Sequence, residues 1–130
     1  MIISYETLPS LREKYPDKKI VFCIGVFDLT HAGHVLFFED AKKLGDILVV
    51  GIGSDAFIKS YKGEKRPILN ENVRVKMVDS LKMVDYVFID KQAAYTGSQV
   101  HHDVLTPIFT MLKPDFYLVN DDGVDNETRL

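Results

Sequence analysis

The sequence predicts an α/β domain built on a parallel sheet with helices on both faces. Apolar runs alternate along the chain with longer amphipathic stretches, which is the order expected of strands joined by helical crossovers. The runs are apolar at consecutive positions, so we expect each strand to be covered on both faces. The chain has 130 residues, 46% of them hydrophobic. This is enough for one core, and we expect a single domain over 1–130.

Residues that are typical of helix ends support this alternation of strands and helices. Gly45 follows the first long amphipathic stretch, where glycine commonly ends a helix. Pro107 is tolerated in the first turn of a later helix, and Lys113-Pro114 should stop it. We therefore predict strands over 20–24, 47–52, 86–89 and 116–119, and helices over 7–15, 31–44, 72–82 and from about 103 to 112.

Composition excludes several classes of protein. Lys and Arg number 16 against 19 Asp and Glu, a net charge of -3, and so we expect no nucleic-acid partner. No apolar stretch approaches the ~20 residues that span a bilayer, and the amino end lacks the pattern of a signal peptide. We expect a cytoplasmic protein without a membrane partner. Cys23, the only cysteine, lies among apolar residues and is expected in the core rather than as a nucleophile.

The loop after the first predicted strand, GVFDLTHAGH at 25–34, concentrates residues suited to phosphate chemistry. Gly25 permits a tight turn, and Gly33 would allow a ligand to approach the start of the following helix. Free backbone N–H groups there, with the helix dipole, would form an anion site. His31 and His34 lie about 60° apart around a helix. Both imidazoles could therefore donate to one phosphate group.

Three interpretations of the histidine pair compete. The residues could simply cap or pack the helix, or they could bind a metal. Metal binding needs a third ligand, and none stands nearby at suitable spacing, so we predict no metal site. Phosphate activation at a strand-to-helix turn is favoured, because the glycines, histidines, strand and helix fall in register. The adjacent pair His101 and His102 is expected to be solvated.

The segment 25–34 resembles the HxGH signature of the cytidylyltransferase-like nucleotidyltransferases. These are Rossmann-like enzymes that move a nucleoside monophosphate from a triphosphate onto a phosphorylated acceptor. The resemblance continues through ILVVGIGSD at 47–55, KGEKRPI at 62–68 and NENVRVKMVDSL at 70–81, and covers most of the chain. The sequence looks most like the adenylyltransferase domain of the bacterial heptose-phosphate enzymes of lipopolysaccharide core biosynthesis. Glycerol-3-phosphate cytidylyltransferases and FAD synthetases are alternatives.

The resemblance implies a role for each matching residue. His31 and His34 would contact the nucleotide phosphates. Lys62 would lie in a flexible loop after the second strand that closes over them. Arg74, near the start of the next helix, would hold the triphosphate. A solvated charged loop is the alternative for Lys62 and Arg66, and a surface helix position is the alternative for Arg74.

The acidic residues near strand ends also have two interpretations each. Asp28 could orient a histidine or a metal-bound water, or accept hydrogen bonds from loop N–H groups. Asp55 follows the second strand, where aspartate is more often a helix cap than a ligand. The resemblance implies that Asp121 and Asp122 contact nucleotide or acceptor, although tandem acids are commonly solvated. Nucleotide binding is also expected of Gly25, Val26, Phe27, Asp28 and Gly33, with Val26 acting through its backbone.

The function implied is transfer of AMP or CMP to a small phosphorylated acceptor such as a sugar phosphate, with release of pyrophosphate. Mg²⁺ is expected with the nucleoside triphosphate, and a homodimer is expected. The family's second signature, a Ser/Thr-rich turn that opens a last helix after a fifth strand, has no match. We therefore expect the last strand and helix to be lacking. Two alternatives stay open: a nucleotide-binding module without turnover, and an unrelated α/β domain in which His31 is buried in apolar packing.

Overall fold

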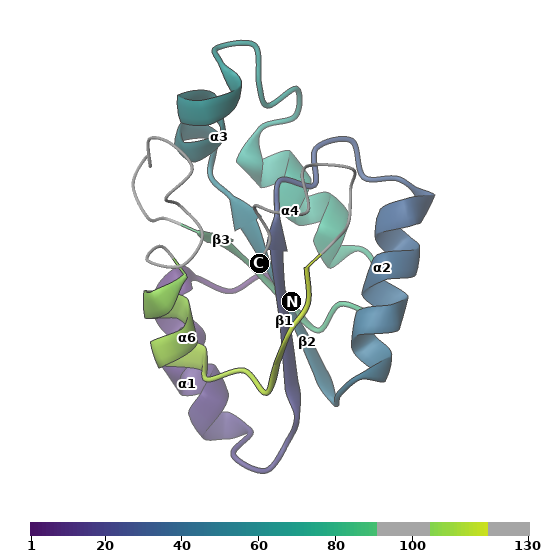
Figure 1. The fold of residues 1–130 in the computed structure, drawn as a ribbon, viewed down its shortest axis with the longest axis vertical. Coiled ribbons are helices and arrows are strands. Elements are labelled where there is room, and N and C mark those ends of the chain that lie inside the picture. The colour runs from purple at the N-terminus through teal and green to yellow at the C-terminus, as the bar shows by residue number, and fades with distance from the viewer. Residues whose placement is uncertain (91–104, 120–130) are drawn as a thin grey trace.

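A computed structural model describes residues 1–90 and 105–119, in which a parallel sheet lies between layers of helices (Figure 1). The strand order is β3-β2-β1-β4, and every neighbouring pair is parallel. The predicted α/β fold with a Rossmann-like sheet is confirmed. The elements are η1 (Tyr5–Thr7), α1 (Leu8–Lys14), β1 (Ile20–Gly25), α2 (Ala32–Lys43), β2 (Ile47–Gly53), α3 (Asp55–Lys62), α4 (Glu71–Asp79), β3 (Tyr86–Asp90), α6 (Thr106–Leu112) and β4 (Phe116–Tyr117).

Helix α3 lies where the sequence analysis expects a loop. The Oγ of Ser54 accepts a hydrogen bond from the backbone N–H of Phe57 at 3.1 Å and so caps the helix. The helix ends at Gly63, whose φ of 96° suits glycine. Ile58 anchors the helix, since its side chain is fully buried. A cap, one buried aliphatic residue and a glycine stop are enough to make this short segment helical.

Strand β4 corrects a second expectation. The side chains of Phe116 and Tyr117 are 42% and 39% exposed, so this strand is not covered on both faces. The reason is position, because among the described residues β4 lies at the edge of the sheet and pairs with β1 alone, over two residues. The expected lack of a further strand and helix concerns 120–130, which lie outside the described residues.

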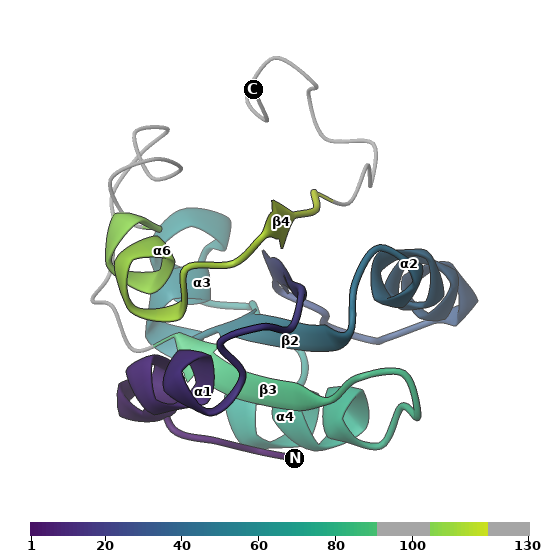
Figure 2. The ribbon, with the colours of Figure 1, turned by 90° about the horizontal axis from the view of Figure 1, so that it is seen from below.

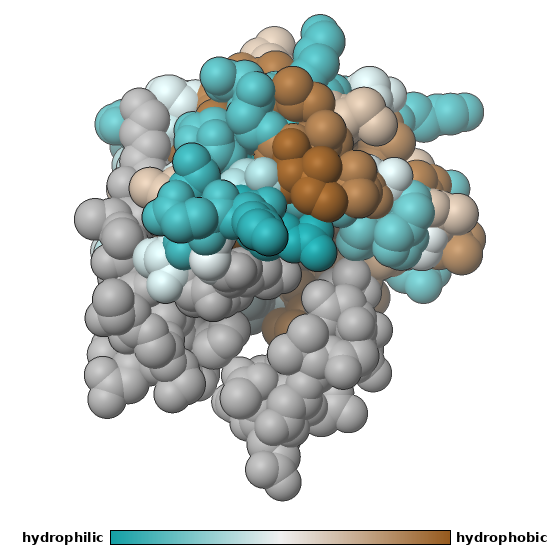
Figure 3. All heavy atoms as spheres, turned by 90° about the horizontal axis from the view of Figure 1, so that it is seen from above, coloured by the Kyte–Doolittle hydropathy of each residue, from teal (hydrophilic) through white to brown (hydrophobic). Residues whose placement is uncertain are grey.

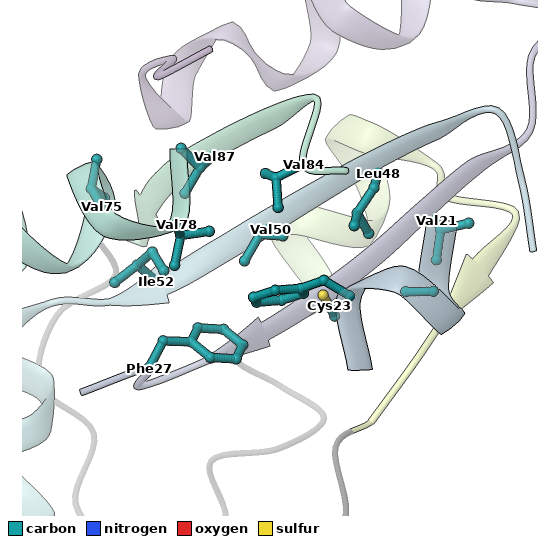
Figure 4. Packing of buried hydrophobic residues seen from close by; sticks show 12 residues of the cluster. Val21, Cys23, Phe27, Leu48, Val50, Ile52, Val75, Val78, Val84 and Val87 are labelled. Carbon is teal, nitrogen blue, oxygen red and sulfur yellow. The ribbon is translucent and has the colours of Figure 1, made fainter. Parts of the chain in front are cut away.

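Side-chain alternation along the strands divides the core into two layers. Val21 and Cys23 pack on one face with residues of α2 and α4 (Figure 4). Ile20 and Phe22 pack on the other face with residues of α1 and α6, the two helices that Figure 2 shows on that side of the sheet. Cys23 is fully buried, as predicted, and burial raises the pKa of its thiol. A thiol held in its protonated form here fills space and is no nucleophile.

Three aspartates join the strands at their amino ends. Each one directly precedes a strand and accepts a hydrogen bond from a backbone N–H at the start of the neighbouring strand. The acceptors and donors are Asp46 and Lys19, Asp85 and Leu48, and Asp115 and Ile20, each at 2.8 Å. We call these three aspartates the amino-end staples.

The opposite end of the molecule, which carries α3, shows a hydrophobic area beside a hydrophilic one (Figure 3). Among the large apolar side chains, Leu29 and Ile68 are 51% and 55% exposed. In the described ranges, none of the helices has the length and apolar character needed to cross a membrane.

Candidate active site

The histidine turn, residues 25–34, joins β1 to α2 and is closed by its own imidazoles. His31 is the N-cap of α2, and its Nδ1 accepts a hydrogen bond from the backbone N–H of Gly33 at 3.0 Å. In return, Nδ1 of His34 accepts from the backbone N–H of His31 at 3.2 Å. The two rings are stacked, with centroids 4.0 Å apart and planes at 25°. The prediction that both rings share one face is confirmed.

This reciprocal cap determines how the imidazoles are protonated. A neutral imidazole has one N–H, and a ring whose Nδ1 accepts a bond carries its proton on Nε2. In the neutral form, each ring therefore carries its N–H on Nε2. His31 is exposed, which contradicts the alternative in which it is buried in apolar packing. The expectation of free N–H groups at the helix start is wrong for Gly33, because the His31 ring already satisfies that donor.

The two glycines of the turn make room for rings. A Cβ on Gly33 would lie 2.8 Å from Cε1 of His31, and a Cβ on Gly25 would lie 2.9 Å from Cζ of Phe27. Both separations are shorter than carbon atoms tolerate. The absence of a Cβ at Gly33 thus makes room for the ring of His31 over the helix start. The sequence had predicted that Gly33 makes room for a ligand.

Phe27 supports the histidine pair from inside the protein. Its side chain is 5% exposed and packs beside Cys23 in the core (Figure 4). Its ring centroid lies 5.4 Å from that of His34, in an edge-on arrangement at 84°. The backbone of Phe27 has a φ of 50° and that of Leu29 a φ of 55°, which is rare for residues other than glycine. The side chain of Phe27 belongs to the core, so the nucleotide contact expected of Phe27 could involve only its backbone.

Arg74 is fully buried, and the interpretation of it as a surface helix residue is wrong. It lies on the buried face of α4 with Val75 and Val78, and its four-residue spacing from Val78 is the one helical signal of burial that the sequence offers. Four hydrogen bonds of 2.8–2.9 Å hold its guanidinium. Nε donates to the carbonyl of Leu69, Nη1 donates to the carbonyls of Val26 and Gly53, and Nη2 donates to Oδ1 of Asp55.

The carboxylate of Asp28 has backbone partners. Its Oδ2 accepts from the N–H of Ile68 at 2.7 Å, and its Oδ1 accepts from the N–H of Leu69 at 2.9 Å. Of the two interpretations, acceptance from loop N–H groups is confirmed. The loop is distant in sequence, forty residues further along the chain, and so the sequence carries no local signal of this pairing.

Asp55 is the ion-pair partner of Arg74, and the helix-cap interpretation is wrong by one residue, since Ser54 is the cap. The backbone N–H of Asp55 donates to Oε1 of Glu71 at 3.1 Å. Glu71 is a residue of this site that was not predicted from the sequence. Its place at the first position of α4 was the available signal, because acidic residues favour helix starts. Arg74, Asp55 and Glu71 together join α3 to α4.

The remaining predicted residues have mixed outcomes. Lys62 is the last residue of α3 rather than part of a loop. Two of the hollows lined by described residues have volumes of about 170 and 300 Å³, and no residue of 25–34 lines either of these two. Across 1–90 and 105–119, no group of three His, Cys, Asp or Glu side chains could hold a metal ion. Four predicted residues, Asp121, Asp122, His101 and His102, lie outside the described residues.

The histidine turn on a parallel sheet places the chain in a known class. The chain belongs to the cytidylyltransferase-like family, whose model matches residues 22–128. The resemblance of the HAGH segment to the nucleotidyltransferases of this family is thereby confirmed.

Two curated proteins are similar in sequence to most of this chain. The chain is 40% identical over 126 residues to the bifunctional protein HldE of Helicobacter acinonychis (strain Sheeba), covering 97% of this chain and 25% of that protein. It is also 40% identical over 120 residues to the bifunctional protein HldE of Campylobacter jejuni subsp. doylei, covering 92% of this chain and 23% of that protein. The chain thus spans about a quarter of the length of these curated relatives.

A solved structure is also similar. It is the lipopolysaccharide core biosynthesis protein from Thermoplasma volcanium GSS1, with a TM-score of 0.65 and 29% identity. The match covers 86% of this chain and 82% of that one. The similarity therefore extends over most of both chains.

Proposed function

We propose that this domain transfers a nucleoside monophosphate from a triphosphate to a small phosphorylated acceptor. AMP and a sugar phosphate are the proposed pair, since the solved relative is a lipopolysaccharide core biosynthesis protein. CMP transfer to glycerol phosphate and AMP transfer to FMN are the variants to be tested beside it. The observation that carries the proposal is the stacked pair His31 and His34, in which both Nδ1 atoms accept backbone N–H groups.

The proposed reaction is an in-line displacement at the α-phosphorus. An oxygen of the acceptor phosphate forms a bond to the α-phosphorus, and the bond from that phosphorus to the oxygen bridging to the β-phosphate breaks. The electron pair leaves with pyrophosphate. Such a step needs alignment and charge stabilisation more than covalent help. Two neutral imidazoles fixed side by side supply N–H donors where negative charge develops.

Cationic side chains of the segment after β2 would complete the phosphate site. Lys62, Lys65 and Arg66 lie close together in sequence, and Lys65 and Arg66 are exposed. Positive charges from this segment would neutralise the departing pyrophosphate. Arg74 has a different part, because its guanidinium is already bonded inside the protein.

Magnesium is proposed to enter with the triphosphate as part of the substrate. The carboxylates of Asp28 and Asp55 already bind N–H groups and Arg74. Within the described ranges there is also no cluster of three metal-ligating side chains. Phosphate oxygens would therefore provide most of the ligands of the ion.

The test is pyrophosphate release from ATP and CTP, each with heptose phosphate, glycerol phosphate and FMN. We expect release with one pair and loss of most of it in the His34→Ala variant. No release by folded protein with any pair would contradict the proposal. Calorimetry then separates the alternative, because triphosphate binding that needs His34 but yields no product indicates a binding module. The oligomeric state, proposed to be a homodimer, is read by light scattering on the same sample.

A further inference from the structure

We infer that Asp28 and Arg74 are positioning residues that fasten the segment 63–70 to the histidine turn. The inference rests on the proposed function for its kinetic consequence, whereas its structural part stands by itself. It assigns to Arg74 a part other than the triphosphate contact that family resemblance implies. The segment 63–70 joins α3 to α4 and carries the exposed cations Lys65 and Arg66.

The peptide units around Leu69 are held from both sides. The N–H of Leu69 donates to Oδ1 of Asp28 at 2.9 Å, and its carbonyl accepts from Nε of Arg74 at 2.9 Å. The N–H of Ile68 donates to Oδ2 of Asp28 at 2.7 Å. Three backbone groups of two consecutive residues are thus bound by two charged side chains. Charge-assisted hydrogen bonds of this kind are stronger than bonds between neutral groups.

The same guanidinium ties this segment to the sheet. Nη1 of Arg74 donates to the carbonyl of Val26, which directly follows β1, and to the carbonyl of Gly53, which ends β2. Nη2 pairs with Asp55 at 2.8 Å at the start of α3. A planar group with five donors can bridge several chain segments, and a lysine ammonium cannot reproduce that geometry. Arg74 therefore fixes the two strand ends and the segment 63–70 relative to one another.

The fastening limits where the cations can lie. Lys65 and Arg66 precede Ile68 by three and two residues, and three residues reach at most about 10 Å. Asp28, which binds the N–H of Ile68, is three residues before His31. The cations and the imidazoles are consequently placed at either side of one short, rigid connection. Loss of this connection should leave the cations and the imidazoles chemically intact, but the distance between them would no longer be fixed.

Arg74→Lys and Asp28→Ala test the inference, with Arg12→Lys as the matched control. Arg12 pairs with Asp115 at the opposite end of the sheet, so its loss should leave the histidine turn unchanged. Asp28→Asn keeps one acceptor oxygen and should be intermediate. The first readout is amide hydrogen exchange at Ile68 and Leu69 without nucleotide. We expect exchange at least tenfold faster in both variants, with β1 amides unchanged in Asp28→Ala.

The second readout is kinetic. Because misplacement by about 1 Å can cost on the order of 10²-fold in rate, we expect kcat to fall by that order while KM for the triphosphate changes little. Unchanged exchange at Ile68 and Leu69 in Asp28→Ala would overturn the inference. A raised KM for the triphosphate with unchanged kcat in Arg74→Lys would also overturn it, since Arg74 would then bind substrate directly. If the wild type shows no turnover, the proposed function fails, and the exchange rates still decide the fastening.

Discussion

The two ends of the parallel sheet are held together in different ways. At the amino end, the three staples each accept one N–H from a neighbouring strand, and the side chains of Asp85 and Asp115 remain 34% and 27% exposed. At the carboxyl end, one fully buried arginine joins two strand ends, a helix start and a loop. The bonds are thus distributed over three aspartates at the amino end and concentrated in Arg74, with support from Asp28, at the carboxyl end.

The end with the concentrated hydrogen bonds is also the end that carries the candidate active site. The carboxyl end contains the left-handed backbone of Phe27 and Leu29 and the exposed His31, features typical of functional loops on a rigid scaffold. Such a loop needs a strong internal connection to hold its shape. The amino end also has one left-handed residue other than glycine, Lys113, but it ends α6 in an ordinary C-cap and does not form a ligand-facing turn. The separate bonds of the staples join the strands there.

The largest expected effect compares an arginine from each end. Arg74→Met should lower the free energy of unfolding by about 3–5 kcal/mol, because it leaves Asp55 and three carbonyls without their buried partner. Arg12→Met should cost less than about 1 kcal/mol, because its pair with Asp115 is partly exposed. Urea unfolding of both variants measures this. Equal losses would remove the distinction between the ends.

The second effect separates turnover from stability within the histidine turn. Asparagine is a good N-cap, so His31→Asn should change the free energy of unfolding by less than about 1 kcal/mol. It removes an Nε2–H donor, and so turnover should fall by about 10²–10³-fold. The measurement is pyrophosphate release beside urea unfolding. Retained turnover would show that the His31 ring serves only as a cap.

The third effect compares two glycines. A Cβ on Gly33 meets the exposed ring of His31, which can rotate away, so Gly33→Ala should cost about 1 kcal/mol of cap energy and about tenfold in turnover. A Cβ on Gly45 would lie 2.8 Å from the carbonyl oxygen of Lys19, which is backbone and cannot move freely. Gly45→Ala should therefore cost about 1–3 kcal/mol and leave turnover unchanged. A larger loss of turnover in Gly45→Ala than in Gly33→Ala would contradict the assignment of the active site to the carboxyl end.

The smallest effect concerns pH at the amino end. The hydrogen bond from Ile20 and the charge of Arg12 lower the pKa of Asp115. A carboxyl whose pKa is lower folded than unfolded stabilises the protein above the unfolded pKa of about 3.9, and that contribution is lost as pH falls through the folded value. Wild-type stability should decline below pH ~4. Asp115→Asn should decline less, and unfolding curves measured from pH 6 to 2 test this.

Local sequence patterns predicted much of the fold and part of the candidate site. Strands β1, β2 and β3 follow from consecutive apolar residues, and the histidine pair follows from its spacing after a strand. Helix α3 is missed because its eight residues make only about two turns, which is too short to establish a helical repeat. The burial of Arg74 is missed because an arginine within a polar stretch is ordinarily exposed.

The sequence by itself determined the parallel α/β fold, the position of the histidine turn and the core placement of Cys23, since these depend on residues near each other in the chain. Only the tertiary structure decided the partners of Asp28, Arg74 and the amino-end staples. Those bonds join residues tens of positions apart. Which distant backbone groups meet is set by strand order and packing, and a single side chain carries no record of either.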